Sequence, residues 1–139
     1  AIDISDKAIN VANKNIINKK LNNQIQLKKT TIDFINNKFD LIVCNPPYLT
    51  KKEMKNISIE IKDYEPLIAL DGGEDGLDFY RTFAKKIYRL MQPNAFFIFE
   101  IGENQFMPCK EIFSLSHLKF NKKSQDLQKK DRIMVYSKL

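Results

Sequence analysis

The segment Asn45-Pro46-Pro47-Tyr48 combines residue types suited to the methylation of a planar, weakly nucleophilic nitrogen. An amide or exocyclic amine shares its lone pair with a π-system, so its two N–H bonds must be held while the nitrogen is aimed at a methyl donor. The Asn45 side-chain oxygen and the Pro46 carbonyl can accept the two hydrogens, and the prolines stiffen this pair. Tyr48 offers an aromatic face for a flat group. We therefore predict Asn45, Pro46 and Tyr48 as catalytic residues and all four as substrate-binding residues.

The segment directly follows the apolar run 39–44, whose length and composition predict a buried strand. A proline-proline turn that merely ends this strand is the alternative interpretation. Tyr48 and the apolar strand before it favour the functional interpretation.

Three polar residues, Asp3, Asn45 and Glu100, lie at the carboxyl ends of predicted strands. Ligands of open α/β sheets bind beyond the carboxyl ends of strands, so the three residues predict one site. Asp3 could accept hydrogen bonds from both hydroxyls of a ribose, or could simply form an Asx turn at a helix start. For Glu100 we favour a structural role, the ordering of the neighbouring loop through Asn104 or Gln105.

Strands and helices are predicted to alternate along the chain. We expect a buried strand that ends near Asp3 and then a helix capped by Ser5, with Ala8, Ile9, Ala12 and Ile16 on one face. Strands are expected at 25–28 and 39–44, followed by helical turns within 49–70 and a helix from Leu77 to Met91. The remaining elements are a strand at 95–101 covered on both faces, a helix at 107–116, and strands at 118–124 and 132–137. This order predicts a layered α/β fold with a mostly parallel sheet. At 139 residues the chain is expected to form one domain.

The composition is that of a globular chain, with 43% hydrophobic and 29% charged residues. No apolar run approaches the roughly 18 residues of a membrane span, and no signal-peptide pattern is present, so we predict a cytoplasmic location. Cys44 and Cys109 are expected to be reduced thiols, and His117 has no partners that would suggest a metal site. The net charge of +6 comes from scattered lysines, which are more typical of a solvated surface than of a nucleic-acid interface.

The chain resembles the peptide chain release factor glutamine methyltransferases, a class I S-adenosylmethionine-dependent family. The resemblance runs from Ala1 to the C-terminal strand and rests on Asp3-Ile4-Ser5, on residues 39–48 and 64–81, on Glu100-Ile101-Gly102 with Gln105, and on Asp126-Leu127 with Asp131-Arg132. The Asn-Pro-Pro-Tyr motif is shared with adenine-N6 and other amine methyltransferases. The stretch from Glu65 to Arg81 is more specific to the glutamine family.

The resemblance implies a Rossmann-like sheet, mostly parallel with an antiparallel C-terminal strand, that forms part of an S-adenosylmethionine-dependent domain spanning residues 1–139. It implies methyl transfer to the side-chain amide of the glutamine in the Gly-Gly-Gln motif of a release factor, a protein partner in translation termination. By analogy, Asn45 and the Pro46 carbonyl hold the amide hydrogens while Tyr48 packs against the glutamine. Asp3, Ile32 and Asn45 would contact the cofactor, and neither a metal nor a membrane is required.

Two departures from the family pattern bear on these expectations. Beside the adenine the chain offers Thr31-Ile32, with Asp33 one step later, where the family usually has an acidic or amide residue followed by an aromatic one. The chain also begins inside the second strand of the family, and the first strand, the glycine-rich loop and the N-terminal helical domain are expected to be absent. We therefore expect the C-terminal portion of such an enzyme.

Two further hypotheses stay open. A nucleic-acid amine methyltransferase of the adenine-N6 type is favoured by the basic charge and by the shared tetrapeptide. A non-catalytic remnant that keeps the sheet would belong to a different functional class, and its exposed strand edges would predict instability or association.

Overall fold

The computed structural model describes residues 1–139, except for the side chain of Asp63. The chain forms two compact units, Ala1–Asn36 and Asn37–Leu139, and each is described by itself. The expectation of one domain therefore stays a prediction. Across the described residues, no helix combines the length and the apolar character that crossing a membrane would require.

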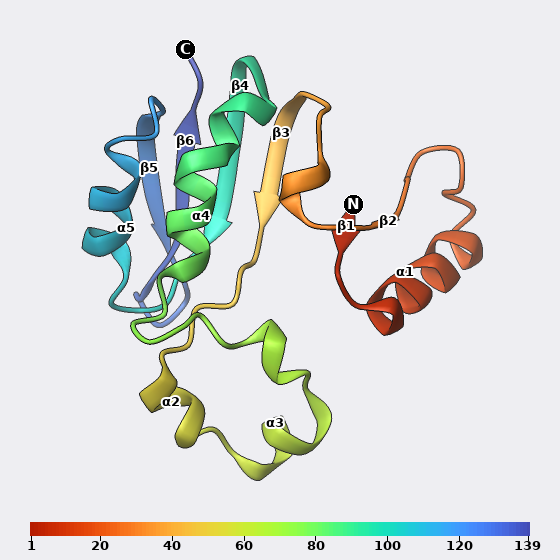
Figure 1. Cartoon of the computed structure of the whole chain (residues 1–139), viewed down its shortest axis with the longest axis horizontal. Helices are drawn as coiled ribbons and strands as arrows, with labels where there is room; N and C mark the ends of the chain where they lie inside the picture. The colour runs from red at the N-terminus through yellow and green to blue at the C-terminus, as the bar shows by residue number, and fades with distance from the viewer. The chain divides into compact units, whose positions relative to one another are not determined.

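The N-terminal unit contains two very short parallel strands and one long helix (Figure 1). These elements are β1 (Ile2–Asp3), α1 (Asp6–Asn18), β2 (Lys28–Lys29) and the 3-10 helix η1 (Ile32–Phe34). The predicted helix cap is confirmed, since the Ser5 hydroxyl accepts a hydrogen bond from the Ala8 N–H at 3.3 Å. The predicted strand at 25–28 is reduced to β2. The prediction that β1 is buried is wrong: Ile2 is 43% exposed, because a two-stranded sheet this short leaves its side chains uncovered.

The C-terminal unit is built on a four-stranded sheet with the order β3-β4-β6-β5. Its elements are β3 (Phe39–Cys44), α2 (Lys51–Lys55), α3 (Ile59–Tyr64), η2 (Leu67–Ala69), α4 (Asp78–Lys86), η3 (Ile87–Leu90), β4 (Met91–Glu100), α5 (Phe106–Phe113), β5 (Lys119–Gln125) and β6 (Asp131–Ser137). Strand β3 is parallel to β4, and β6 is antiparallel to both β4 and β5. Three strands therefore run in one direction and β6 runs against them, as expected.

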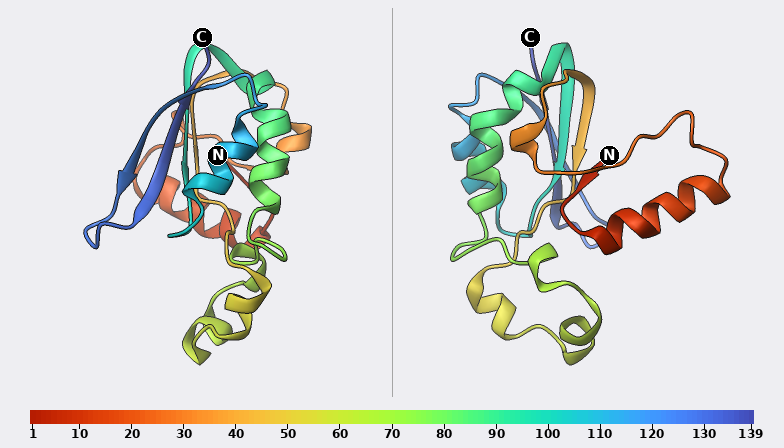
Figure 2. Two further views of the ribbon diagram at one scale, coloured as in Figure 1. Left: turned by 90° about the vertical axis from the view of Figure 1, so that its left-hand side faces the viewer. Right: turned by 45° about the vertical axis from the view of Figure 1, so that its right-hand side comes forward.

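Helices α4 and α5 pack on the same face of this sheet (Figure 2). The core between them is aromatic, because Phe97 and Phe99 of β4 meet rings from both helices and from β6. Ring centroids lie 5.7 Å apart for Phe83 and Phe97 and 4.9 Å apart for Phe99 and Phe113. Such stacked and tilted pairs fix the strand ends on which the site depends.

The expectation that 39–44 is buried and that 95–101 is covered on both faces is wrong. Leu41 is 54% exposed and Val43 is 68% exposed, and Phe96 of β4 is 44% exposed. Their neighbours Phe97 and Phe99 are almost completely buried. The reason is the alternation of side chains along a strand, which sends every second residue to the face opposite α4 and α5.

Candidate functional site

The Asn45-Pro46-Pro47-Tyr48 segment leaves the carboxyl end of β3, as the sequence predicts. Asn45 is exposed, Pro46 is buried, and Pro47 and Tyr48 are half-buried. The segment thus presents an exposed amide side chain on a stiff backbone that is anchored by a buried ring. The geometry is compatible with the proposed pair of acceptors, whose catalytic role stays a prediction.

Tyr48 and Glu100 meet at the carboxyl ends of β3 and β4. The Tyr48 hydroxyl donates to Glu100 Oε1 at 3.1 Å. Burial, and then the negative charge of Glu100, raise the pKa of Tyr48 above its ordinary value, so the side chain remains a neutral phenol at neutral pH. The prediction that Glu100 orders its loop through Asn104 or Gln105 is wrong for its side chain, because the carboxylate binds Tyr48.

The segment 70–73 lies alongside Leu49 and Lys51. Leu49 N–H donates to the Leu70 carbonyl at 2.9 Å, and Gly72 N–H donates to the Leu49 carbonyl at 2.8 Å. Lys51 N–H donates to the Gly73 carbonyl at 3.1 Å. The connection after the Asn-Pro-Pro-Tyr segment therefore folds back, and its residue Asp71 forms a parallel bridge with Leu49. This bridge fixes the path of the chain where it leaves the segment.

Close backbone contacts explain two of the glycines in this region. A Cβ atom on Gly72 would lie 2.8 Å from Tyr48 Cα, and a Cβ atom on Gly76 would lie 2.4 Å from the Tyr48 carbonyl oxygen. Gly76 also has a φ of +76°, in the region that favours glycine. The turn around Gly72 and Gly76 can approach Tyr48 only because both side chains are missing.

The start of α4 is fixed by charged pairs. Arg81 donates to Asp75 through Nη1 at 2.9 Å and Nη2 at 2.5 Å, and its Nη1 also donates to Asp78 at 3.1 Å. The hydrogen bonds from Arg81 lower the pKa of Asp75. The part of the Glu65 to Arg81 stretch that carries these residues therefore organises the turn that contacts Tyr48.

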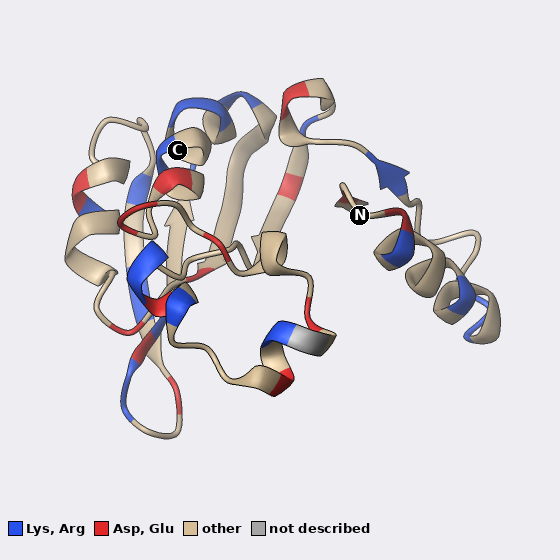
Figure 3. Ribbon diagram, turned by 60° about the horizontal axis from the view of Figure 1, so that its bottom comes forward, with Lys and Arg blue, Asp and Glu red and all other residues tan. Residues whose placement is uncertain are grey.

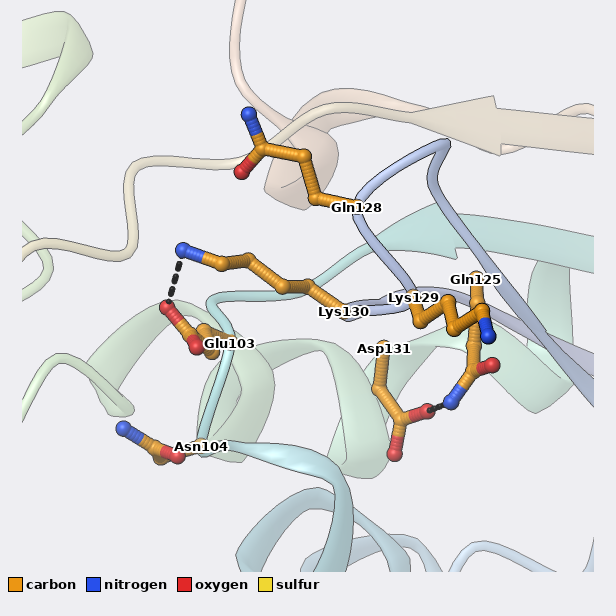
Figure 4. A pocket seen from close by; sticks show the side chains of 7 residues that line it. All are labelled: Glu103, Asn104, Gln125, Gln128, Lys129, Lys130 and Asp131. Atoms are coloured by element: carbon orange, nitrogen blue, oxygen red, sulfur yellow. Dashed lines mark hydrogen bonds and ion pairs between the residues drawn. The ribbon is translucent and has the colours of Figure 1, made fainter.

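The hairpin between β5 and β6 adds a polar cavity that the sequence does not predict (Figure 4). Its volume is about 330 Å³, and its lining comes from the hairpin and from the turn after β4: Glu103, Asn104, Gln125, Gln128, Lys129, Lys130 and Asp131. Lys130 Nζ lies 2.9 Å from Glu103 Oε2 and links the two elements. The basic residues of the chain are otherwise spread over helices, strands and loops (Figure 3).

A family model described as Eco57I restriction-modification methylase matches residues 1–133, which is most of the chain. The chain belongs to this family. Curated proteins confirm the resemblance to the release factor glutamine methyltransferases that the sequence indicates.

Two such relatives illustrate the match. The release factor glutamine methyltransferase of Caulobacter vibrioides is 35% identical over 136 residues, covering 96% of this chain and 47% of the relative. The bifunctional methyltransferase of Rickettsia typhi is 39% identical over 139 residues, covering 99% of this chain and 27% of the relative. The chain thus spans about half the length of the first relative and about a quarter of the second.

Solved methyltransferase structures share the fold of this Eco57I-family chain. A methyltransferase from Pyrococcus furiosus has a TM-score of 0.68 at 14% identity, covering 99% of this chain and 61% of that chain. The magnesium protoporphyrin IX methyltransferase from Synechocystis PCC 6803, solved with bound SAM, has a TM-score of 0.65 at 12% identity, covering 99% of this chain and 58% of that chain. The fold is that of the class I methyltransferases, as predicted.

The two remaining cofactor candidates lie in the N-terminal unit, where Asp3 ends β1 and Ile32 begins η1, shortly after β2. Asp3 pairs with Lys29, and the Thr30 N–H donates to the Asp3 carbonyl at 3.1 Å, so the two strand ends are adjacent. Asp3 is exposed, and its Oδ1 accepts from the Ser5 N–H at 2.7 Å, which is the Asx turn considered above. Ile32 is buried, which leaves little of its side chain for a ligand.

The sequence did not predict the contacts of the Gln105 side chain. Its side chain donates to the Tyr48 and Gly76 carbonyls, whereas the sequence indicated only a contact with Glu100 and a match to a family position. A glutamine that follows a Glu-Ile-Gly turn was the available signal.

Proposed function

We propose that the chain carries the acceptor-binding part of a methyltransferase that modifies the side-chain amide nitrogen of a glutamine. The substrate we propose is the glutamine in the Gly-Gly-Gln motif of a peptide chain release factor, and the methyl donor is S-adenosylmethionine. The observation that carries the proposal is the exposed Asn45 amide on a loop held by buried Pro46 and by the Tyr48–Glu100 hydrogen bond. The name of the Caulobacter vibrioides relative supports the substrate.

The proposed chemistry needs two acceptors that face one primary amide. Asn45 Oδ1 and the Pro46 carbonyl would each accept one N–H hydrogen, so that the nitrogen lone pair turns toward the methyl donor. The Tyr48 carbonyl already accepts a hydrogen bond from Gln105 Nε2 at 2.9 Å. The substrate amide would therefore use the Pro46 carbonyl, which lies earlier in the same loop. Positioning of this kind contributes through orientation, without a covalent enzyme intermediate.

The aromatic ring of Tyr48 would pack against the flat substrate amide. Its hydroxyl is tied to Glu100, so the ring has a fixed direction from which to pack against the substrate. The raised pKa keeps the phenol protonated, and a neutral ring adds no negative charge beside the reacting nitrogen.

The donor would supply an electrophilic methyl group on a sulfonium. An exposed carboxylate at the end of β1, next to the end of β2, suits the two hydroxyls of a ribose, so Asp3 fits this role. The burial of Ile32 fits an adenine contact less well. The cofactor contact of Asn45 stays a prediction.

The direct test is methyl transfer from isotope-labelled S-adenosylmethionine to a purified bacterial release factor. We expect label on the glutamine of its Gly-Gly-Gln motif, located by mass spectrometry of the digested product. A release factor with that glutamine replaced by alanine is the matched control and should stay unlabelled. Label that persists on the control would contradict the proposed substrate.

The second candidate is methylation of an exocyclic amine in nucleic acid. It is favoured by the description of the matching family as a restriction-modification methylase and by the net charge of +6. The same acceptor pair would hold the two hydrogens of an adenine amine, with Tyr48 stacked on the base. Parallel reactions with duplex DNA and with transfer RNA separate the candidates, because only one substrate should take up label at a rate that depends on Asn45.

A further inference from the structure

One glutamine connects three loops of the C-terminal unit. Gln105 Nε2 donates to the Tyr48 carbonyl at 2.9 Å and to the Gly76 carbonyl at 3.1 Å. Gln105 Oε1 accepts from the Gly102 N–H at 2.9 Å and lies 3.3 Å from the Tyr80 hydroxyl. The primary amide therefore uses both donor hydrogens and one acceptor position, and its second acceptor position faces the Tyr80 hydroxyl.

The orientation of this amide is fixed by its neighbours. The two carbonyls on one side accept hydrogen bonds only, and the Gly102 N–H on the other side only donates, so an exchange of Nε2 and Oε1 would break three bonds. Tyr80 is buried, and its hydroxyl donates to the Glu100 carbonyl at 2.9 Å. This second contact ties the same cluster to the end of β4.

The Gln105 amide packs closely against two glycine backbones. A Cβ atom on Gly76 would lie 2.6 Å from Gln105 Nε2, and a Cβ atom on Gly102 would lie 2.9 Å from Gln105 Oε1. Glycine backbones thus surround the amide on two sides. The Tyr48 carbonyl can be reached at this distance because these positions carry no side chain.

We propose that Gln105 is a positioning residue that sets the Asn45–Tyr48 segment in its acceptor-binding geometry by holding the Tyr48 carbonyl. This inference rests on the proposed function. Gln105 does not contact the substrate; it fixes the backbone three residues after Asn45, while the two prolines transmit this constraint back to the acceptor pair. The turn around Gly76 is held by the same amide, so one side chain links both loops.

Two variants separate the donor from the acceptor function of this side chain. Gln105→Met removes both the donor and the acceptor but keeps a side chain of similar size. Gln105→Glu keeps the acceptor for the Gly102 N–H but turns an oxygen toward the Tyr48 and Gly76 carbonyls. Gln128→Met, at an exposed position of the β5–β6 hairpin, is the matched control.

The first readout needs no activity. We expect the carbonyl ¹³C resonances of Tyr48 and Gly76 to move in both Gln105 variants and to stay in place in the control, while the amide resonances of the Phe97 and Phe99 core strand remain dispersed. Unchanged Tyr48 and Gly76 carbonyl resonances in a folded Gln105→Met protein would overturn the inference, whatever substrate the protein methylates.

The second readout is turnover of the full chain with release factor. Both Gln105 variants should lower kcat by about 10-fold to 100-fold with KM changed less, because a misplaced acceptor loop costs orientation. Lowering the pH from about 8 to about 5 should partly restore kcat only in Gln105→Glu, since the two facing carbonyls raise the pKa of the introduced carboxyl and its protonated form can donate one hydrogen. Wild-type kcat in a Gln105→Met protein would overturn the positioning role. If the wild type is inactive but the Tyr48 carbonyl resonance still moves in the Gln105 variants, the proposed function is refuted. The hydrogen bond from Gln105 to the Tyr48 carbonyl is then supported.

Discussion

The Tyr48 hydroxyl donates a hydrogen bond to the Glu100 carboxylate, with 3.1 Å between the phenol oxygen and Glu100 Oε1. Tyr48→Phe keeps the ring and removes this bond, so we expect kcat to fall by about 10-fold, the scale of one hydrogen bond to a charged group. Glu100→Gln retains a neutral acceptor and should cost less. A Tyr48→Phe protein with unchanged kcat would show that the bond does not contribute to the chemistry.

The same pair gives a prediction for titration. The charge of Glu100 raises the pKa of Tyr48 in addition to the larger effect of burial. Glu100→Gln should therefore lower the pKa of Tyr48 toward, but not down to, its ordinary value. NMR titration of ¹³C-labelled tyrosine rings measures the shift, and an unaltered Tyr48 titration would contradict it.

Asn45 is the residue on which the proposed chemistry depends most directly. Asn45→Ala removes one of the two acceptors and should cut kcat by about 100-fold or more, as expected for the loss of a group that acts in the transition state. Because Asn45 is exposed, the fold should be unaffected. Asn10→Ala on the exposed side of α1 is the control, and near-normal turnover by Asn45→Ala would refute the assigned role.

The sequence predicted the site best where a local pattern controls the structure. Ser5 caps α1 within a few residues, and Asn45 follows β3 directly, so both could be placed from spacing alone. The bond from Gln105 to the Tyr48 carbonyl joins residues 57 positions apart and depends on the packing of three loops. The exposure of the Val43 side chain likewise depends on which elements cover the sheet, and a continuous apolar run in the sequence does not predict it.

Asp3 provides a test of cofactor binding that is independent of turnover. Asp3→Ala removes the proposed partner of the ribose hydroxyls and should weaken S-adenosylmethionine binding by about 10-fold to 100-fold, the range for a hydrogen bond to a charged group. Calorimetric titration measures this, with Asp6→Ala three residues further along the chain as the control. Equal affinities for the wild type and Asp3→Ala would show that Asp3 forms the Asx turn and does not contribute to cofactor binding.

Gly76 should be intolerant of any side chain. Gly76→Ala places a Cβ atom 2.4 Å from the Tyr48 carbonyl oxygen at a φ of +76°, so we expect a loss of about 2 kcal/mol or more in the free energy of unfolding. Gly102→Ala is the comparison, because its Cβ atom would meet the end of the Gln105 side chain, which can move. Denaturant unfolding of both variants decides the matter, and equal stability losses would argue against the close approach at Tyr48.

Acidification should destabilise the C-terminal unit through four aspartates. Hydrogen bonds from Lys51, Arg81 and Lys123 lower the pKa values of Asp71, Asp75 and Asp131, and the backbone N–H of Lys130 does the same for Asp126. Each folded-state pKa lies below the value in the unfolded chain, so the stabilisation is present above about pH 4 and is lost as the pH falls through the folded-state values. The thermal midpoint should decline between about pH 5 and about pH 2. Asp126→Asn should flatten that decline, whereas a midpoint that stays level in the wild type would contradict the linkage.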